Sequence, residues 1–427
     1  MLISGGRISY TVFVLPLMEY FDWSRAQVSL PFSISMLMWG LGQPVAGILM
    51  DRYGARALIL VGIVQTGLGF LISAAASELW HLNFGYGVLV GLAATSAGQI
   101  GYALIVAKWF DGPRRGFAMG ICMAATPLST LITAPLFYWV IISSGWRVAF
   151  QGLAIAILVV AFPLAWLVLH DPHSSRAAAP APKSLAWAAG TAGTLGVEES
   201  AGTTAAAVDA TSAAGGSLGA ETLALIRNRS LQLLALAYVS CGISGFFFAA
   251  HLAPMAGDFG LSPAVGAAAV SIFSAASVAG SFLGGAASDR YGRSRVLSMT
   301  FLIRAIGFLG LAFAVFNTPT YYLAAILAGG PIFATVTIIN TMVYEIAGPR
   351  RTGLAIGLIL LIHQLGATVG PYAGGLLYDI TGSYLPMLLA AAAFLLGSSL
   401  LVRRIGDTAV VGTRKESCRT PQPSAQP

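Results

Sequence analysis

The sequence predicts an all-α membrane protein with about twelve transmembrane helices in two six-helix bundles. Of its 427 residues, 57% are hydrophobic and only 9% are charged, and the mean hydropathy is +0.80. Such a chain is too apolar for an ordinary soluble domain. Apolar stretches of about 20 residues recur, the length that crosses a bilayer core of roughly 30 Å as a helix. A charged motif also occurs twice, about half a chain length apart.

Twelve stretches along the chain qualify as transmembrane spans. The predicted spans are residues 1–21, 28–50, 57–77, 82–107, 117–142, 148–169, 230–251, 263–287, 297–316, 319–345, 353–378 and 385–402. The first of them is short, because Met1 begins almost inside apolar sequence and Arg7 follows within two turns. Either this first helix is truncated or the true start lies upstream.

The two halves of the chain match at several ordered places. Asp51-Arg-Tyr-Gly54, between the second and third spans, returns as Asp289-Arg-Tyr-Gly292 between the eighth and ninth. The segment 21–26 matches 259–264, and 112–120 matches 348–357, at nearly the same offset. Matches at one offset indicate parallel repeats.

Between the halves lies a segment rich in Ala, Gly, Ser, Thr and Pro, which cannot bury a core and is predicted to be disordered. The predicted division is an N-terminal bundle (1–170), a cytoplasmic linker (171–221), a C-terminal bundle (222–404) and a disordered cytoplasmic tail (405–427).

The distribution of the basic residues that give the net charge of +7 indicates how the chain is oriented in the membrane. With the N-terminus placed in the cytoplasm, the Lys and Arg residues fall on cytoplasmic segments, except Arg25 and Arg147 outside and Arg7 and Arg304 within spans. This positive-inside bias predicts that both termini are cytoplasmic, in a multi-pass protein of the inner (plasma) membrane. The expected partners are the lipid bilayer and a small-molecule substrate, with no nucleic acid, and the protein is expected to be a monomer.

The paired D-R-Y-G loops, the Gly-Pro-Arg-Arg segments at 112–115 and 348–351 and the six-plus-six layout resemble the major facilitator superfamily. Within it, Trp23-Ser-Arg-Ala26, Lys108-Trp-Phe110, His363-Gln-Leu-Gly366 and Gly374-Gly-Leu-Leu-Tyr-Asp379 resemble the bacterial monocarboxylate-transporter-like and oxalate/formate-antiporter-like branch. The resemblance implies the major-facilitator fold and alternating access.

The resemblance also gives the D-R-x-G loops a role in gating. An Asp at one helix end can face the N-terminal dipole of a neighbouring helix, while an Arg pairs with carboxylates across the cytoplasmic side. The alternative is an ordinary positively charged turn. The expected gating residues are Asp51, Arg52, Arg56, Asp289, Arg290 and Arg293.

By family analogy, spans one, four, seven and ten line the central cavity. Arg7 is the principal candidate there, because a charge inside a membrane is costly and a guanidinium can hold a carboxylate with two hydrogen bonds. The alternative is that Arg7 lies near the cytoplasmic surface and extends its charge into water. The candidate substrate-binding residues are Arg7, Tyr10, Gln99, Tyr102, Tyr238, His251, Asn340 and His363. Each of the polar and His candidates also has a structural interpretation as a hydrogen-bonding residue between helices.

Other features limit the chemistry. Arg304, two turns into span nine, is interpreted as reaching toward the surface or forming a structural pair. The Asp and Glu residues lie at span ends, loops or tails, and the eighth span lacks the anion-binding Arg of the related branch. Neither Cys nor His residues show metal-ligand spacing, so no metal or cofactor is expected.

The sequence therefore predicts a secondary transporter of a small organic anion, such as a monocarboxylate, by proton symport or anion exchange. The alternatives are an exporter of a drug or sugar-like molecule of the same superfamily and, less favoured, an integral-membrane transferase. An enzyme is not expected, since no cluster of His, Asp or Glu lies at a membrane face.

Overall fold

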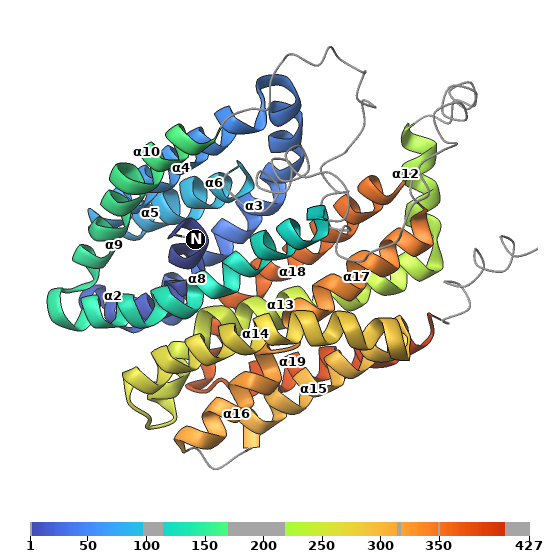
Figure 1. The fold of residues 1–427 in the computed structure, drawn as a ribbon. Helices are drawn as coiled ribbons and strands as arrows, with labels where there is room; N and C mark the ends of the chain where they lie inside the picture. Colours follow the sequence, from blue (N-terminus) through green and yellow to red (C-terminus); the bar gives the residue numbers. More distant parts are fainter. Residues whose placement is uncertain (1, 97–113, 170–217, 314–316, 349–350, 406–427) are drawn as a thin grey trace, which may run out of the picture.

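The computed structural model describes residues 2–96, 114–169, 218–313, 317–348 and 351–405, and these residues form helices joined by short turns and bends (Figure 1). The N-terminal bundle contains α1 (Leu2–Ile8), η1 (Ser9–Phe13), α2 (Val14–Phe21), α3 (Arg25–Tyr53), α4 (Ala55–Ala74), α5 (Leu79–Leu82), η2 (Asn83–Val90), α6 (Gly91–Ser96), α8 (Arg114–Ser144), α9 (Trp146–Ile155), η3 (Ala156–Ala161) and α10 (Phe162–Val168). The short segments join end to end, so that α1–η1–α2, α5–η2–α6 and α9–η3–α10 each correspond to one predicted span.

The C-terminal bundle contains α12 (Leu218–Arg227), α13 (Arg229–Asp258), α14 (Pro263–Tyr291), α15 (Arg293–Phe313), α16 (Thr318–Gly329), α17 (Ile332–Ala347), α18 (Thr352–Thr381) and α19 (Leu385–Arg403). Helix α12 was not predicted, and its first residues overlap the end of the predicted linker. The rest of that linker, 171–217, and the tail from 406 lie outside the described residues. The all-helical fold predicted from the sequence is confirmed.

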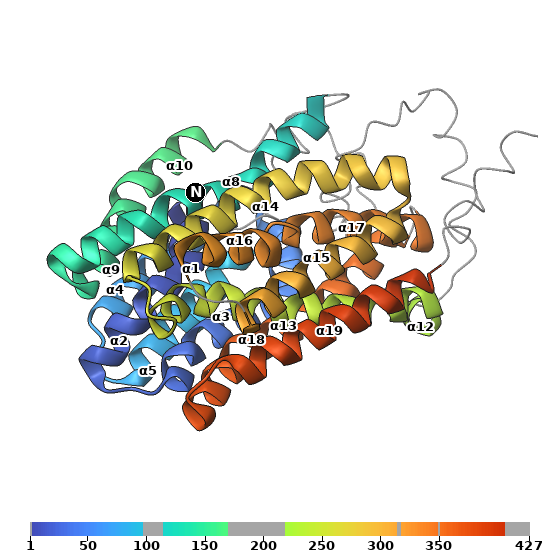
Figure 2. The ribbon, with the colours of Figure 1, turned by 90° about the horizontal axis from the view of Figure 1, so that it is seen from below.

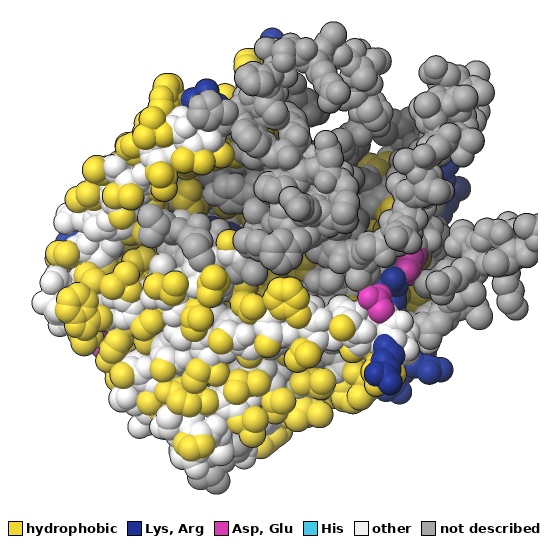
Figure 3. Space-filling view, in the orientation of Figure 1, with side chains coloured by type: hydrophobic (Ala, Val, Ile, Leu, Met, Phe, Trp, Pro, Cys, Tyr) yellow, Lys and Arg dark blue, Asp and Glu magenta, His cyan; other side chains and the backbone are white. Residues whose placement is uncertain are grey.

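Nine helices within the described ranges are long and apolar enough to cross a membrane. The outer surface suits that environment, because many large hydrophobic side chains lie exposed on it, such as Val61, Leu167 and Leu283. Figure 3 shows hydrophobic side chains spread over the described part of this face, and a group of charged side chains at one end of the C-terminal bundle. An apolar belt with charges at its margin is the surface of a membrane protein.

The repeat appears in the geometry of individual helices. Helices α3 and α14 each have 29 residues, and each follows a Ser in extended conformation, Ser24 and Ser262. Each also ends at a glycine with positive φ, Gly54 (φ 83°, ψ 152°) and Gly292 (φ 94°, ψ 138°). The matched D-R-Y-G motifs therefore form the same helix-to-helix joint in the two halves.

The two bundles lie side by side, and α3 and α8 of the first face α18 and α14 of the second (Figures 1 and 2). Helices α3 and α18 run antiparallel, since Arg25 lies near Asp379 and Gly40 lies near Gln364. We call the end with the α2–α3, α13–α14 and α18–α19 connections the Arg25 end. The opposite end, with the α3–α4 and α14–α15 connections, is the Arg290 end.

Candidate functional site

The start of α3 is held by a carboxylate from the other bundle. The first N–H groups of a helix have no partner within the helix. Here the backbone N–H groups of Arg25 and Ala26 donate to the two carboxylate oxygens of Asp379 on α18, at 2.9 and 2.8 Å. The next N–H, of Gln27, donates to the Ser24 side chain, and the Gln27 side chain accepts from the Ser24 backbone, as in a capping box. Asp379 thus satisfies both the free N–H groups and the helix dipole.

The Arg25 side chain makes a second link to the C-terminal bundle. Its guanidinium binds both oxygens of Asp258, the last residue of α13, with the Nη2–Oδ1 bond at 2.6 Å. It also donates to the Tyr384 hydroxyl at 2.8 Å and lies 3.6 Å over the Tyr378 ring. Tyr378 in turn donates to Asp258 at 2.8 Å. We call Arg25, Asp258, Tyr378, Asp379 and Tyr384 the Arg25 gate, because they join the two bundles at this end.

Below the gate, α3 and α18 stay in close contact. Ser29 and Ser33, one and two turns after Arg25, lie on the same helix face and are buried. Ser33 accepts the Tyr372 backbone N–H at 3.1 Å, and Ser29 Oγ lies 3.4 Å from His251 Nε2. A Cβ on Gly375 would lie 2.7 Å from the Arg25 backbone oxygen, so only glycine permits this approach. The interface between α3 and α18 is therefore closed at the Arg25 end, while a cavity of ≈ 460 Å³ lies between α2 and α8 of the first bundle and α13 of the second.

Midway along the interface, Arg7 is buried in the N-terminal bundle. Its guanidinium lies 4.4 Å from the centre of the Trp39 ring and 3.6 Å from the Met36 sulfur. The Tyr86 hydroxyl donates to the Arg7 backbone oxygen. Within the described part of the chain, no carboxylate lies within ion-pair distance of Arg7. The interpretation that Arg7 reaches into water at the surface is wrong, because the residue is only 5% exposed.

The C-terminal bundle presents polar groups nearby. The Trp39 ring lies 6.5 Å from Phe246, whose ring lies 5.9 Å from His363. His363 Nδ1 donates to the Gln364 side-chain oxygen at 3.1 Å, and the Tyr238 ring lies 4.1 Å from the imidazole. The Gln364 side-chain nitrogen is buried with no hydrogen-bond partner among the described residues. A buried N–H group left in this way is costly and is available to a ligand.

The predicted substrate residues divide into groups. Arg7, Tyr238 and His363 lie along this aromatic path, and Asn340 is buried in α17. The Tyr10 hydroxyl donates to the Val28 backbone oxygen, inside the N-terminal bundle. His251 lies beside the Arg25 gate rather than midway along the interface. Gln99 and Tyr102 lie outside the described residues.

The predicted gating residues lie at the Arg290 end. Arg293 binds Glu345 at 2.5 Å and Asp289 at 3.3 Å, both within the C-terminal bundle. Arg52 and Arg290 lie over the rings of Tyr53 and Tyr291, their neighbours in sequence. Arg56 donates to the Trp166 backbone oxygen at 3.1 Å. The side chain of Asp51 lies outside the described set. The gating role of these residues therefore stays a prediction.

Arg304 corrects one of the interpretations drawn from the sequence. It is fully buried between α13, α15 and α16, so the idea that it reaches toward the surface is wrong. It donates to the Ser244 hydroxyl at 2.8 Å, to Cys241 sulfur at 3.1 Å and to the Ala328 backbone oxygen at 3.2 Å. These bonds tie three helices of one bundle together, which favours the structural interpretation.

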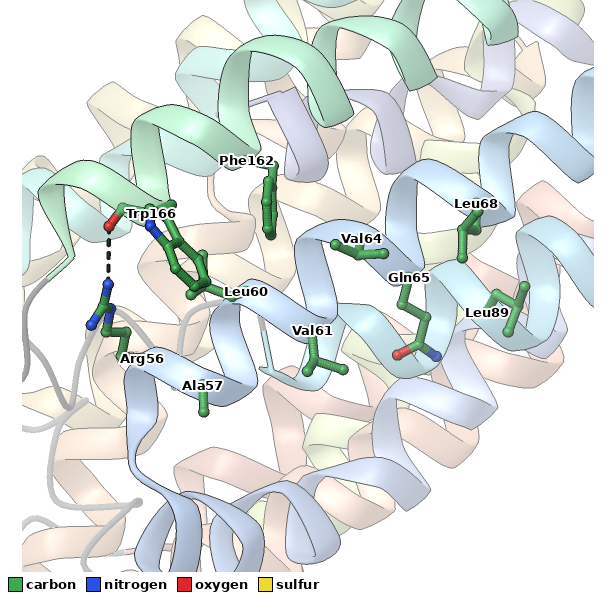
Figure 4. A pocket seen from close by; sticks show the side chains of 10 residues that line it. All are labelled: Arg56, Ala57, Leu60, Val61, Val64, Gln65, Leu68, Leu89, Phe162 and Trp166. Atoms are coloured by element: carbon green, nitrogen blue, oxygen red, sulfur yellow. Dashed lines mark hydrogen bonds between the residues drawn. The ribbon is translucent and has the colours of Figure 1, made fainter.

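A cavity of ≈ 780 Å³ lies elsewhere, between α4, η2 and α10 of the N-terminal bundle. Figure 4 shows Phe162 and Trp166 on one side, Leu68 and Leu89 on the other, and Arg56 at one end. Its walls are mostly apolar, and α4 and α10 make their main contacts within their own bundle. This cavity is a groove on the outside of the bundle and not a path between the bundles.

The sequence does not predict the Arg25 gate. In the sequence, the segments 23–26 and 374–379 indicate only a family branch, and Arg25 is only a basic residue on the outer side. The position of Arg25 on the outer side, against the positive-inside bias, could have indicated the gate, because an Arg that is buried at the end of an apolar helix needs a partner. Nothing in the sequence could identify Asp258 and Asp379 as the partners.

Comparisons with known proteins agree with this architecture. The family model of the Major Facilitator Superfamily matches residues 1–250 and 232–418. An uncharacterized MFS-type transporter, YcxA, of Bacillus subtilis is 26% identical, covering 94% of this chain and 91% of the relative. Monocarboxylate transporter 13 of Bos taurus is 26% identical (94% and 85%), and monocarboxylate transporter 11 of Homo sapiens is 28% identical (90% and 75%).

Among solved structures, a bacterial homolog of the human lysosomal transporter Spinster, in an inward-facing and unoccupied conformation, has the same fold. The TM-score is 0.65 at 17% identity, covering 99% of this chain and 96% of the other. Within the described residues, no group of three or more His, Cys, Asp or Glu could hold a metal ion. The chain is an integral, multi-pass membrane transporter and not an enzyme, and it belongs to the major facilitator superfamily, where its relatives include the monocarboxylate transporters.

Proposed function

We propose that this secondary transporter carries a small monocarboxylate, which binds between the two bundles at Arg7. Transport follows alternating access and uses proton symport or anion exchange. The main support is Arg7 itself. A buried guanidinium without a described carboxylate partner is costly. A bound carboxylate would supply the missing charge with two parallel hydrogen bonds.

The surroundings of Arg7 support a small ligand. Trp39 and Phe246 bring apolar rings to both sides of the interface, which suits a short hydrocarbon group. Gln364 offers an unused N–H, and His363 accepts or donates at Nε2 according to its protonation. A site with one cation, few polar groups and aromatic walls favours a small monocarboxylate over a sugar, which needs many hydrogen bonds.

The charge distribution supports an orientation. Most described basic residues lie at the Arg290 end, among them Arg52, Arg229 and Arg403, whereas Arg25 and Arg147 lie at the opposite end. By the positive-inside rule, the Arg290 end faces the cytoplasm and the Arg25 end faces outside. The state with a closed Arg25 gate is then closed to the outside.

The test is direct binding of short monocarboxylates to the purified protein. Arg7→Lys keeps the charge but loses the planar pair of donors, and Arg7→Ala loses both. A charge-assisted hydrogen bond contributes about 1.5–3 kcal/mol, so we expect roughly 10- to 100-fold weaker binding for Arg7→Lys and no measurable binding for Arg7→Ala. Arg229→Ala, which removes an exposed Arg at the start of α13, is the matched control and should bind like the wild type.

Thermal unfolding of all four proteins shows whether each variant is folded. Equal affinity of folded wild type, Arg7→Lys and Arg7→Ala would mean that Arg7 does not recognise the substrate. Binding of a neutral sugar but of no carboxylate would overturn the substrate class as well.

A further inference from the structure

His251 is a buried titratable side chain that the proposed substrate site does not use. It lies on α13 two turns before Asp258, hence on the same helix face, and it is fully buried. Its Nε2 lies 2.8 Å from the Pro371 backbone oxygen on α18, and its Nδ1 lies 2.8 Å from the Tyr384 hydroxyl. His251 therefore lies directly beneath the Arg25 gate and contacts one of its members.

These neighbours fix the protonation pattern of the ring. The Pro371 backbone oxygen can only accept, so Nε2 carries a hydrogen. The Tyr384 oxygen already accepts from Arg25, so its own O–H is free to donate to Nδ1 of a neutral ring. The result is an ordered chain in which Arg25 donates to Tyr384, Tyr384 to His251, and His251 to Pro371.

The chain depends on Tyr384 keeping its proton. Tyr384 lies between α18 and α19, and burial raises its pKa above the ordinary value. The hydroxyl thus remains a donor at any physiological pH. The hydroxyl has one hydrogen to donate, and it donates that hydrogen to His251 only while Nδ1 is unprotonated. The protonation state of His251 therefore determines the direction of these hydrogen bonds.

Protonation of His251 would reverse this pattern. A second N–H at Nδ1 would point at the Tyr384 oxygen, so the hydroxyl hydrogen would have to turn away. Tyr384 would then accept from two cations, Arg25 and His251. Because a second positive charge would lie beside Arg25 in a buried place, the closed arrangement would lose free energy.

The charged groups that face His251 come from every helix packed around it. Arg25 on α3 repels an imidazolium, while Asp258 on α13 and Asp379 on α18 attract one. Both carboxylates are already engaged, Asp258 with Arg25 and Asp379 with the α3 backbone. An imidazolium could gain their attraction only by competing with the bonds that join the bundles.

We propose that His251 is a proton-binding residue that controls the Arg25 gate, which is closed when the imidazole is neutral and opens when it is protonated. The proposal rests on the proposed transport function, because it assigns to that function the residue that senses protons. Proton binding at Nδ1 requires only rotation of the Tyr384 hydroxyl and separation of Arg25 from its partners.

The test measures the gate itself, without substrate. In a protein with Cys122, Cys241 and Cys418 replaced by Ser, spin labels are attached through Ser77→Cys and Ser262→Cys. Both sites are exposed at the Arg25 end, one in each bundle. The distance between the labels is measured by pulsed electron spin resonance between pH 8 and pH 5.

In the otherwise unchanged protein, the fraction with a long distance should rise as the pH falls. A single proton site changes the ratio of open to closed protein by at most about tenfold per pH unit. His251→Gln should remain closed at every pH, since an amide can donate to Pro371 and accept from Tyr384 as the neutral ring does. His81→Gln, which changes a less buried His at the same end, should keep the normal response.

The variant Tyr384→Phe provides a second test by the same distance measurement, because it removes the hydroxyl that links His251 to Arg25. Its gate should open more at pH 8 and respond less to pH. A normal pH response in His251→Gln would overturn the proposal, because another group would then bind the proton. Since no substrate is present, this result is independent of whether Arg7 binds a carboxylate.

Discussion

Arg25 serves the interface with both its side chain and its backbone. The guanidinium binds Asp258 and Tyr384, and the backbone N–H binds Asp379. Its Nε is buried and has no hydrogen-bond partner among the described residues. A buried cation is tolerated only while its partners remain, so loss of one partner affects the whole gate.

The variant Asp258→Asn tests this dependence. The amide keeps the oxygen that accepts from Tyr378 but loses the charge that faces Arg25. We expect the closed state to lose about 1–3 kcal/mol, so the ratio of open to closed protein should rise roughly 5- to 150-fold at constant pH. The measurement is the labelling rate of Ser33→Cys by a maleimide, because Ser33 is only 2% exposed in the closed interface.

Asp22→Asn is the control, since Asp22 is an exposed acid at the same end and Asn tolerates its left-handed backbone (φ 55°). Its labelling rate should equal that of the parent protein. A slow rate in Asp258→Asn would show that the ion pair does not hold the gate closed.

For the helices, the sequence predicted their existence and their order more accurately than their first and last residues. The predicted span 28–50 is α3, Arg25–Tyr53, whose charged ends continue the helix because Ser24 and Asp379 cap it at one end and Gly54 ends it at the other. Span 319–345 is divided into α16 and α17 at Gly330–Pro331. The ring of Pro331 lacks an N–H and disfavours a continuous helix. The irregular segments η1, η2 and η3 were not predicted. Segments η1 and η3 contain neither Gly nor Pro, and Gly85 and Gly87 of η2 lie in a chain rich in glycine.

The duplicated joints lead to a prediction on stability. Gly292 has φ 94° and ψ 138°, a region that is essentially restricted to glycine. Gly292→Ala should therefore cost about 1–3 kcal/mol and lower the thermal unfolding midpoint. Gly310→Ala is the control, because Gly310 is helical and a Cβ there meets no atom within 4 Å. An Ala at that helical position should be neutral or slightly stabilising. An unchanged midpoint in Gly292→Ala would mean that the joint relaxes without cost.

At the scale of the whole molecule, repetition predicted the two bundles, but it could not predict where they meet. Arg25 corresponds in the repeat to Pro263, which has no N–H and no charge, so the gate exists in one half only. Its partners on α13 and α18 are far from α3 in sequence, and no local pattern connects them. The candidate substrate site could also be predicted only in part. Arg7 was predicted from its charge within a span, whereas Gln364 becomes a candidate only because the structure shows its side-chain nitrogen buried and unpaired among the described residues.

The proposed orientation is tested by labelling intact cells. In the background without native cysteines, Ser262→Cys at the Arg25 end should react with a membrane-impermeant maleimide. Arg404→Cys, exposed just after α19 at the opposite end, should react only after the membrane is permeabilised. The opposite pattern would place the Arg25 end in the cytoplasm and reverse the positive-inside assignment.

The two links at the Arg25 end differ in what they recognise. Asp258 recognises a side chain, but Asp379 recognises only the main chain of α3 and the dipole of its first turn. Any residue other than proline at positions 25 and 26 presents the same N–H groups to Asp379. Substitution at position 25 can therefore change the strength of the side-chain link, or the signal that breaks it. The backbone link meanwhile keeps α3 and α18 in register.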